Sequence, residues 1–281
     1  MPNIIKASGE IAPFEPEKLR RSLLKIGTDP ALVEQIVEHV ILSLHEGMST
    51  REIYRIAFRQ LRATSRTIAA KYHLKRAMMR LGITGYPFEK YFAEILRNKG
   101  FQSQTNQFIQ GRCVTHEVDI VAKNNKKNIY VECKYHNRQG KKCNVKTPLY
   151  VKARFIDIQE TQTNSLGLFE GWLVTNTRFT SDAIQYGICA GLNLIGWDYP
   201  INDSLQEQIE ISGLYPITCI TDFTKTDLIN LFARNIVLCK SIGEDPTLLD
   251  SMQMSLSKKN SILKQCKKLC HIFNAKRNSE G

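Results

Sequence analysis

The sequence contains no run of about 18 apolar residues, the minimum length for a membrane-spanning helix. Its first six residues, MPNIIK, lack the basic start, the apolar stretch and the small-residue cleavage site of a signal peptide. We therefore expect a cytoplasmic protein without a membrane partner. In that reducing compartment the eight cysteines, none of which forms a C-x-x-C pair, are expected to be mostly buried thiols.

Two further features are scarce or missing. No G-x-x-x-x-G-K-[ST] loop occurs, so we expect no nucleotide hydrolysis by a P-loop mechanism. Negative charge is in deficit, because 27 Asp and Glu residues stand against 39 Lys and Arg residues, which gives a net charge of +12. Such an excess favours polyanions through counterion release, and nucleic acid is the natural candidate.

The 281 residues are enough for two or three domains, each with its own core. The first 80 or so predict a short extended piece followed by four helices. Asp29-Pro30 is a helix cap followed by a first-turn proline, and Ser49 with Glu52 forms a capping box that opens a helix. After the fourth helix, near 67–81, glycine and proline break the pattern. We therefore assign a mostly helical first domain to residues 1–84.

The pattern then changes to alternating helices and strands, which predicts an α/β domain with a mixed sheet over residues 85–200. The expected elements are a helix at 88–98, strands near 101–109, 117–122 and 128–135, a helix from about 148, a strand at 171–175, a helix from about 181 and a short strand at 193–196. Residues 201–281 are expected to form a small helical region, helical from about 226 and ending in a lysine-rich stretch.

Candidate catalytic residues lie on two neighbouring strands of the central domain. Asp119 is on one strand, and Glu132 and Lys134 share a face of the next, because side chains alternate along a strand. Two carboxylates brought together suit a hard cation such as Mg²⁺ or Mn²⁺, which keeps sites for water and phosphate. With Lys134 orienting water or offsetting phosphate charge, this set suits phosphodiester hydrolysis.

The helix at 88–98 offers a third acid. At about 100° per residue, Glu89 falls at the edge of the apolar stripe, whereas Glu94 lies on the opposite, solvated face. Glu89 is therefore expected to reach the site. Four basic residues that follow the catalytic strand are candidates for phosphate contacts: Arg138, Lys141, Lys142 and Lys146.

These motifs carry a resemblance. Phe88-Glu89, the segment HEVDI at 116–120 and Glu132-Cys133-Lys134 resemble the PD-(D/E)xK, restriction endonuclease-like fold, especially its Mrr-like branch, over roughly residues 86–200. The resemblance implies an endonuclease in which Asp119, Glu132 and Glu89 hold the metal and Lys134 is the catalytic lysine. DNA is the implied substrate.

The first domain resembles the ATP-cone over residues 3–82, through Ile5-Lys6, Gly9, Lys18-Leu19 and the segment GMST at 47–50. The resemblance implies that Lys6, Lys18, Thr50 and either Lys75 or Arg76 contact ATP or dATP, which would act as an allosteric ligand. The sequence departs from the family at Ala7-Ser8, where an Arg-Asp pair is usual.

The C-terminal region resembles a helix-hairpin-helix module through Ile242-Gly243 and Leu248-Leu249, although a simple helical cap fits equally. Three functions remain open. The leading one is a nucleotide-regulated DNA endonuclease that cleaves foreign or modified DNA, as restriction systems do. A homodimer is compatible with this function, because cutting two strands usually needs two active sites. The others are a DNA-binding regulator with a non-catalytic nuclease fold, and a nuclease for RNA or branched DNA.

Overall fold

The computed structural model describes residues 1–82, 85–138, 140–161 and 167–277, with side chains to Cys270. The N-terminal domain consists of β1 (Asn3–Ile5), β2 (Ile11–Pro13), α1 (Pro16–Lys25), α2 (Pro30–Ser43), β3 (Met48–Ser49), α3 (Thr50–Thr64) and α4 (Arg66–Met78). The strands form a small sheet in the order β2-β1-β3. Asp29 caps α2 and the Ser49–Glu52 capping box opens α3, as predicted.

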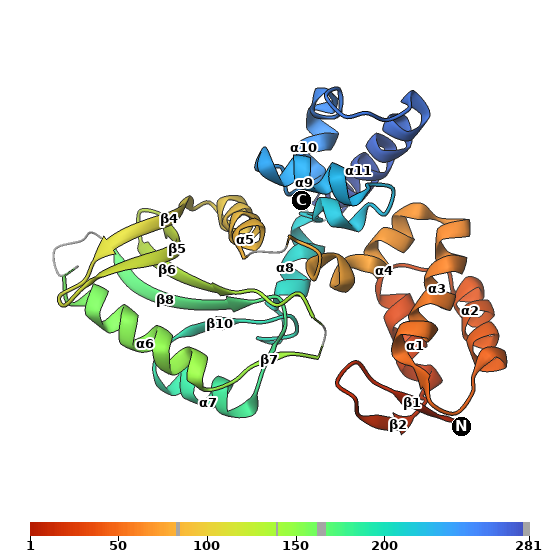
Figure 1. The fold of residues 1–281 in the computed structure, drawn as a ribbon, viewed down its shortest axis with the longest axis horizontal. Helices are drawn as coiled ribbons and strands as arrows, with labels where there is room; N and C mark the ends of the chain where they lie inside the picture. The colour runs from red at the N-terminus through yellow and green to blue at the C-terminus, as the bar shows by residue number, and fades with distance from the viewer. Residues whose placement is uncertain (83–84, 139, 162–166, 278–281) are drawn as a thin grey trace.

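The central domain is a five-stranded mixed sheet covered on both faces, and the α/β prediction is confirmed. Its elements are α5 (Tyr86–Asn98), β4 (Gln102–Gln110), β5 (Thr115–Lys123), β6 (Lys127–Lys134), β7 (Lys142–Cys143), α6 (Lys146–Gln159), β8 (Leu168–Thr175), β9 (Arg178–Phe179), α7 (Ser181–Cys189) and β10 (Asn193–Ile195). The large sheet has the order β10-β8-β6-β5-β4, while β7 and β9 form a short parallel pair. Helix α5 lies on one face, and α6 and α7 lie on the other (Figure 1).

The central strand β6 pairs antiparallel with β5 and parallel with β8. Its side chains are buried on both faces over most of its length: Val131 packs toward α5, and Tyr130 packs toward α6 and stacks on Phe169. Tyr130 lies on the same face of β6 as Glu132 and Lys134, and helix α6 covers it. The polar end of β6, at Glu132 and Lys134, is therefore where this buried strand reaches solvent.

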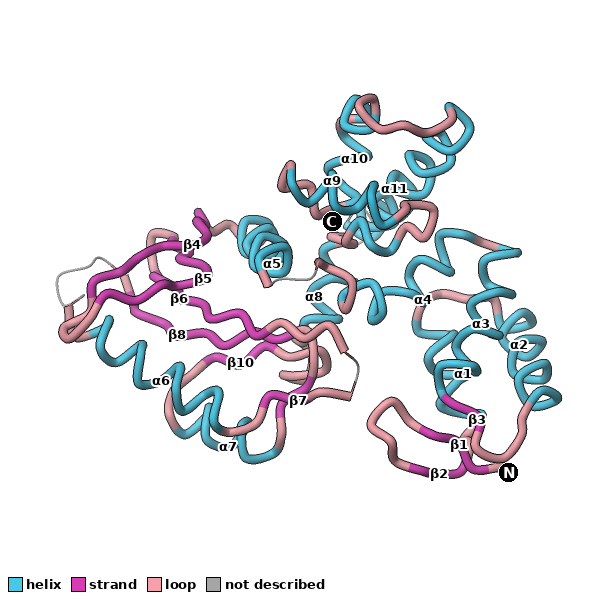
Figure 2. The backbone as a smooth tube through the Cα atoms, in the orientation of Figure 1, coloured by secondary structure: helices cyan, strands magenta, loops and turns pink. Residues whose placement is uncertain are grey.

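The C-terminal region is helical, with α8 (Leu205–Ser212), η1 (Ile217–Cys219), α9 (Lys225–Ala233), α10 (Cys239–Glu244), η2 (Pro246–Leu249) and α11 (Leu256–Arg277). Helix α8 begins about 20 residues before the predicted start, at a capping box of Ser204 and Glu207. The buried side chains of this region join one core with those of α4 and α5. Figure 2 shows α8 between α5 and α4. The region is therefore packed into the molecule and is more than a surface cap.

Candidate active site

Asp119 lies where strands β5 and β6 stop pairing with each other. The ladder between them ends at the pair Ile120–Val131. One residue further, Asp119 Oδ2 accepts a hydrogen bond from the backbone amide of Cys133 at 2.7 Å. The carboxylate thus replaces a strand carbonyl as the acceptor, and this bond fixes Asp119 beside Glu132 and Lys134.

Strand β5 also changes the face that it presents at this point. Val118 packs with the cluster under α6 and α7, whereas Ile120 packs with the cluster under α5. Across the sheet, Asn106 of β4 has a left-handed φ of 54° and lies between the residues that pair with Val118 and Ile120. This local change of face occurs at Asp119, in the middle of β5 and one residue beyond the last β5–β6 pair.

Glu132 is held by a residue that sequence reasoning missed. Arg154 Nη1 donates a hydrogen bond to Glu132 Oε2 at 2.5 Å, and the two side chains are only 15% and 13% exposed. The same Nη1 donates to the backbone oxygen of Glu117 at 3.1 Å. Arg154 lies on α6, 22 residues after Glu132, and no sequence motif links the two.

Glu89 reaches the same site from the first turn of α5. Burial, and then the negative charges of Asp119, Glu117 and Glu132, raise the pKa of Glu89 to about 7. Glu94 instead forms an ion pair with Arg97 on the outer side of the helix. The helix thus carries one acid toward the sheet and one away from it.

The carboxylates of the site act strongly on one another. Burial, and then the charge of Asp119, raise the pKa of Glu132 to about 7, against the opposing effect of Arg154. Burial also raises the pKa of Asp119, although the Cys133 amide and Arg154 act in the other direction. Glu117, two residues before Asp119 on β5, adds to this negative field and was not among the predicted site residues.

Lys134 closes β6 and is exposed at its end. Its positive charge lowers the pKa of both Asp119 and Glu132, so the ammonium acts on both carboxylates. The backbone around it is held firmly, because Thr175 Oγ1 donates to the carbonyl of Lys134 at 2.7 Å. The fully buried Asn176 then bonds both the amide and the carbonyl of His136 at 2.8 Å.

The donor chemistry of the site fits a hard divalent cation. The charges of Asp119 and Glu132 raise the pKa of Glu89, and the charge of Asp119 raises that of Glu132, so a bound cation would relieve this repulsion. Among the described residues, no group of three or more His, Cys, Asp or Glu side chains is gathered closely enough to hold a metal ion. The acids share an electrostatic field, with Arg154 on one oxygen of Glu132.

The raised pKa values predict how stability responds to pH. Glu89 and Glu132 have an ordinary value of 4.5 and a folded value of about 7, so the folded state binds more protons between these values than the unfolded state does. Their contribution to the free energy of unfolding therefore falls as pH rises through that window. We expect Glu89→Gln to raise the unfolding temperature in EDTA at pH 8 by on the order of 2 °C or more. At pH 4 the difference from wild type should vanish, and an equal difference at both pH values would contradict the assignment.

The nucleotide residues predicted for the first domain lie around one cavity of about 300 Å³. Lys6, Lys18 and Thr50 line it together with apolar side chains, those of Ile4, Pro13, Phe14, Leu19 and Ile53. Both lysines are paired with glutamates, Lys6 with Glu10 and Lys18 with Glu15, each at 2.6 Å. Their contact with nucleotide remains a prediction.

Arg76 does not line that cavity. Its guanidinium lies over the ring of Tyr54 at 3.7 Å, and Tyr54 is one helical turn along α3 from Thr50. Lys75, the alternative, has its ammonium over Trp197 at 5.8 Å. The residue identities alone could not predict this, because the stacking depends on how α3 and α4 pack.

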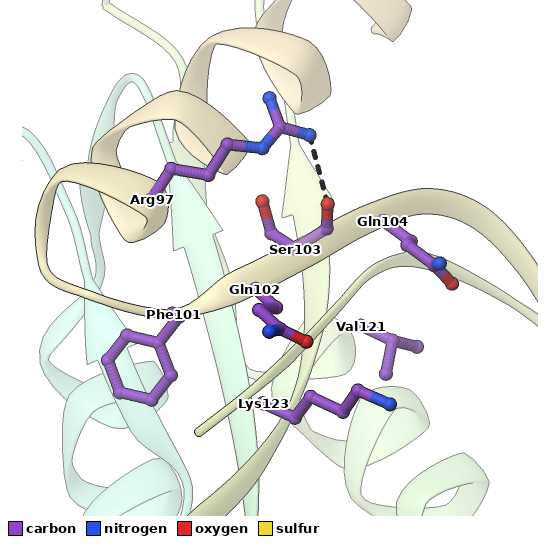
Figure 3. A pocket seen from close by; sticks show the side chains of 7 residues that line it. All are labelled: Arg97, Phe101, Gln102, Ser103, Gln104, Val121 and Lys123. Atoms are coloured by element: carbon purple, nitrogen blue, oxygen red, sulfur yellow. Dashed lines mark hydrogen bonds between the residues drawn. The ribbon is translucent and has the colours of Figure 1, made fainter. Parts of the chain in front are cut away.

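The four candidate phosphate contacts, Arg138, Lys141, Lys142 and Lys146, are all exposed near the end of β6 and the start of α6. A separate cavity of about 510 Å³ lies at the end of β5 that carries Lys123, with Arg97 and Gln102 among its other lining residues (Figure 3). None of the predicted site residues lines it. The catalytic candidates and this cavity are therefore distinct features of the sheet.

Family models match the chain in succession. Residues 2–79 match the ATP cone domain, residues 80–198 match the restriction endonuclease family, and residues 215–270 match the AF1548-like C-terminal family. A protein of Archaeoglobus fulgidus, which carries only the name uncharacterized protein, is 33% identical over 180 residues, or 63% of this chain and 98% of that protein. The chain belongs to the AF1548-like family.

A solved AF1548-like structure, described as the crystal structure of a protein of unknown function, AF1548, matches with a TM-score of 0.55 and 32% identity. The matched region covers 67% of this chain and 99% of the chain in that structure. These findings confirm the two resemblances seen in the sequence, an ATP-cone followed by a restriction endonuclease-like domain. In the described part of this AF1548-like chain, no helix has the length and apolar character needed to cross a membrane.

Proposed function

We propose that this AF1548-like protein is a metal-dependent endonuclease that hydrolyses DNA phosphodiester bonds and responds to ATP or dATP. The observation that carries the proposal is the electrostatic field in which Asp119 and Glu132 act on Glu89, and in which the charge of Lys134 acts on Asp119 and Glu132. The restriction endonuclease match and the ATP-cone match support its two halves. Restriction of foreign or modified DNA is the biological setting that we propose.

In this proposal Asp119, Glu132 and Glu89 hold Mg²⁺ or Mn²⁺, which when bound polarises a phosphate oxygen and makes water more acidic. The ammonium of Lys134 orients the attacking water and offsets charge that develops on the phosphate. Arg138, Lys141, Lys142 and Lys146 position the DNA backbone next to that site. Since duplex cleavage needs two cuts, we propose that two copies act together.

The deciding experiment is incubation of the purified chain with supercoiled plasmid, with linear modified and unmodified DNA, and with structured RNA and branched DNA, each in Mg²⁺ or EDTA. Cleavage of DNA in Mg²⁺ alone supports the proposal. Cleavage of RNA or branched DNA alone would reassign the substrate. Binding of DNA without cleavage of any substrate would favour a nucleotide-sensing regulator built on a nuclease fold.

The two acids of α5 should differ sharply in their effect on cleavage. Glu89→Ala is expected to lower the rate at least about tenfold, or some 1.4 kcal/mol of barrier, because it removes one acid of the site. Glu94→Ala is the matched control, since it removes an acid from the same helix whose ion-pair partner in the described part of the chain is Arg97. Single-turnover cleavage measures both, and a larger loss in Glu94→Ala would show that the helix acids are wrongly assigned.

The tail lysines should contribute to DNA affinity in a salt-dependent way. Lys264, Lys267 and Lys268 are exposed beside one shallow cavity on α11. Replacing all three with glutamine is expected to reduce the slope of log affinity against log salt by about 2 to 3, since each phosphate contact contributes about 0.9. Point changes are needed because Ile262, Cys266 and Leu269 of the same helix are buried in the core.

The control for this measurement is the pair Lys258 and Lys259. These lysines are already engaged, Lys258 with Asp227 at 3.0 Å and Lys259 with Asp250 at 3.4 Å. Their replacement with glutamine should leave the salt slope nearly unchanged. If the slope falls equally in both triple and double variants, or in neither, the lysines of α11 do not form a specific DNA contact.

A further inference from the structure

Arg154 is fixed between the two catalytic strands by more contacts than an ordinary ion pair has. Its Nη1 bridges Glu132 Oε2 on β6, at 2.5 Å, and the Glu117 carbonyl on β5, at 3.1 Å. Its Nη2 donates to the hydroxyl of Tyr150, and its guanidinium lies 4.8 Å from the centre of the Tyr150 ring. Tyr150 is one turn earlier on α6, so the helix itself sets the position of the guanidinium.

These contacts fix the orientation of the Glu132 carboxylate. The bond from Arg154 uses Oε2, and no described residue donates a hydrogen bond to Oε1. A carboxylate at the end of a strand otherwise rotates freely about its side-chain bonds, which costs entropy when a ligand fixes it. With Oε2 held, Oε1 is left as the free acceptor in the field shared with Asp119.

Charge balance alone does not require this arrangement. An ammonium anywhere near the acids would offset their charge, and Lys134 already does so from β6. Arg154 instead bridges two strands with one nitrogen and is braced by an aromatic hydroxyl with the other. A planar guanidinium holds its two terminal nitrogens in one fixed fork, whereas the ammonium of lysine is a compact charge whose three donors rotate on a flexible stem.

We propose that Arg154 is a positioning residue: it holds Glu132 in the orientation that binds the divalent cation, and Tyr150 holds Arg154. This inference rests on the proposed nuclease function, which supplies the divalent cation that Glu132 would bind. It concerns the metal-free protein directly, because the contacts exist between this chain's own residues. Outer contacts of this kind typically change metal affinity or activity by about 10-fold to 100-fold when they are removed.

The test measures Mn²⁺ binding to the full chain by calorimetry, and cleavage at saturating Mn²⁺, for Arg154→Ala, Arg154→Lys and Tyr150→Phe. A positioning role predicts that Arg154→Ala weakens Mn²⁺ binding and lowers the saturated rate, each by about tenfold or more. Arg154→Lys should recover only part of the loss, and Tyr150→Phe should show a smaller loss in the same direction. Arg112→Ala, which removes a surface guanidinium paired with Glu160 at 2.9 Å, should behave as wild type.

The opposite sign would overturn the proposal. If Arg154 only balanced charge, its removal would tighten Mn²⁺ binding, and Arg154→Lys would match wild type. Thermal denaturation in EDTA shows whether the Arg154 variants are folded. If they are not, the Mn²⁺ affinity of Tyr150→Phe, which retains the ring, decides between the two roles of Arg154. If the wild-type chain binds Mn²⁺ through Glu132, shown by loss in Glu132→Ala, but cuts no substrate, the nuclease proposal fails while Mn²⁺ affinity still decides the role of Arg154.

Discussion

Replacing Asp119 or Lys134 with alanine is expected to abolish cleavage while the chain remains folded. Asp119 is proposed as a metal ligand and Lys134 as the group that acts on water and phosphate. Loss of either should lower the single-turnover rate by about 1,000-fold or more, which corresponds to about 4 kcal/mol of barrier. Plasmid cleavage in Mg²⁺ measures the rate, and calorimetry should show loss of cation binding in the Asp119 variant alone.

The structure supplies a sharper control for Asp119 than alanine does. Its Oδ2 accepts the amide of Cys133, so alanine leaves a partly buried donor unpaired, at a cost of about 1 to 3 kcal/mol of stability. Asp119→Asn retains an acceptor oxygen and removes the charge, and it should be inactive with wild-type stability. Lys123→Ala, at the far exposed end of β5, is the matched lysine control. Near wild-type cleavage by Asp119→Asn or Lys134→Ala would refute the assignment.

The sequence was sufficient to predict the features of this site that depend on local spacing. Alternation along β6 placed Glu132 and Lys134 on one face, and helical spacing separated Glu89 from Glu94. The structure has Glu89 facing the sheet acids and Glu94 paired with Arg97, as that spacing implies. Local rules apply here because the side of a helix or strand on which each acid lies is set by that element's own periodicity.

The features that the sequence could not predict depend on packing between distant segments. Arg154 reaches Glu132 only because α6 lies across the face of β6, and helix packing fixes which of its residues points at the strand. The same reason explains the shared core of α4, α5 and the C-terminal helices, where Thr218 Oγ1 bonds the carbonyl of Ala77 across 141 residues. No short motif encodes such contacts.

The contact between the two halves of the molecule gives nucleotide regulation a physical route. The turn between β1 and β2 lies against the loop that follows the catalytic strand: a Cβ on Gly140 would come within 2.7 Å of the Ala7 carbonyl oxygen. The positive charge of Lys142 in that loop also lowers the pKa of Glu10 in the turn. Glu10 is the partner of Lys6, which lines the cavity, so the turn between β1 and β2 lies between the cavity and the loop that follows β6.

A second connection runs through Asn176. Its Nδ2 donates to the carbonyl of His136, two residues after Lys134, and lies 3.4 Å from the carbonyl of Met78 at the end of α4. In the proposed regulation, a ligand that shifts the first domain would therefore act on the end of β6 from two sides. Because a ligand changes an equilibrium only by its preference for one state, the expected coupling is about 1 to 3 kcal/mol, or roughly 5-fold to 150-fold.

Replacing Lys6 and Lys18 together with alanine is expected to remove the effect of ATP or dATP on cleavage and to leave basal cleavage and thermal stability close to wild type. Both ammonium groups line the cavity of the first domain, and nucleotide phosphates would draw them from Glu10 and Glu15. Their exposed ion pairs contribute little to stability, about 0 to 1 kcal/mol each. Calorimetry measures nucleotide affinity, and cleavage assays with and without nucleotide measure the regulatory effect. DNA should change nucleotide affinity by the same factor by which nucleotide changes DNA affinity. If the wild-type chain binds neither ATP nor dATP at millimolar concentration, regulation by this domain is refuted. The presence of Ala7-Ser8 in place of the usual Arg-Asp pair would then explain the lack of nucleotide binding.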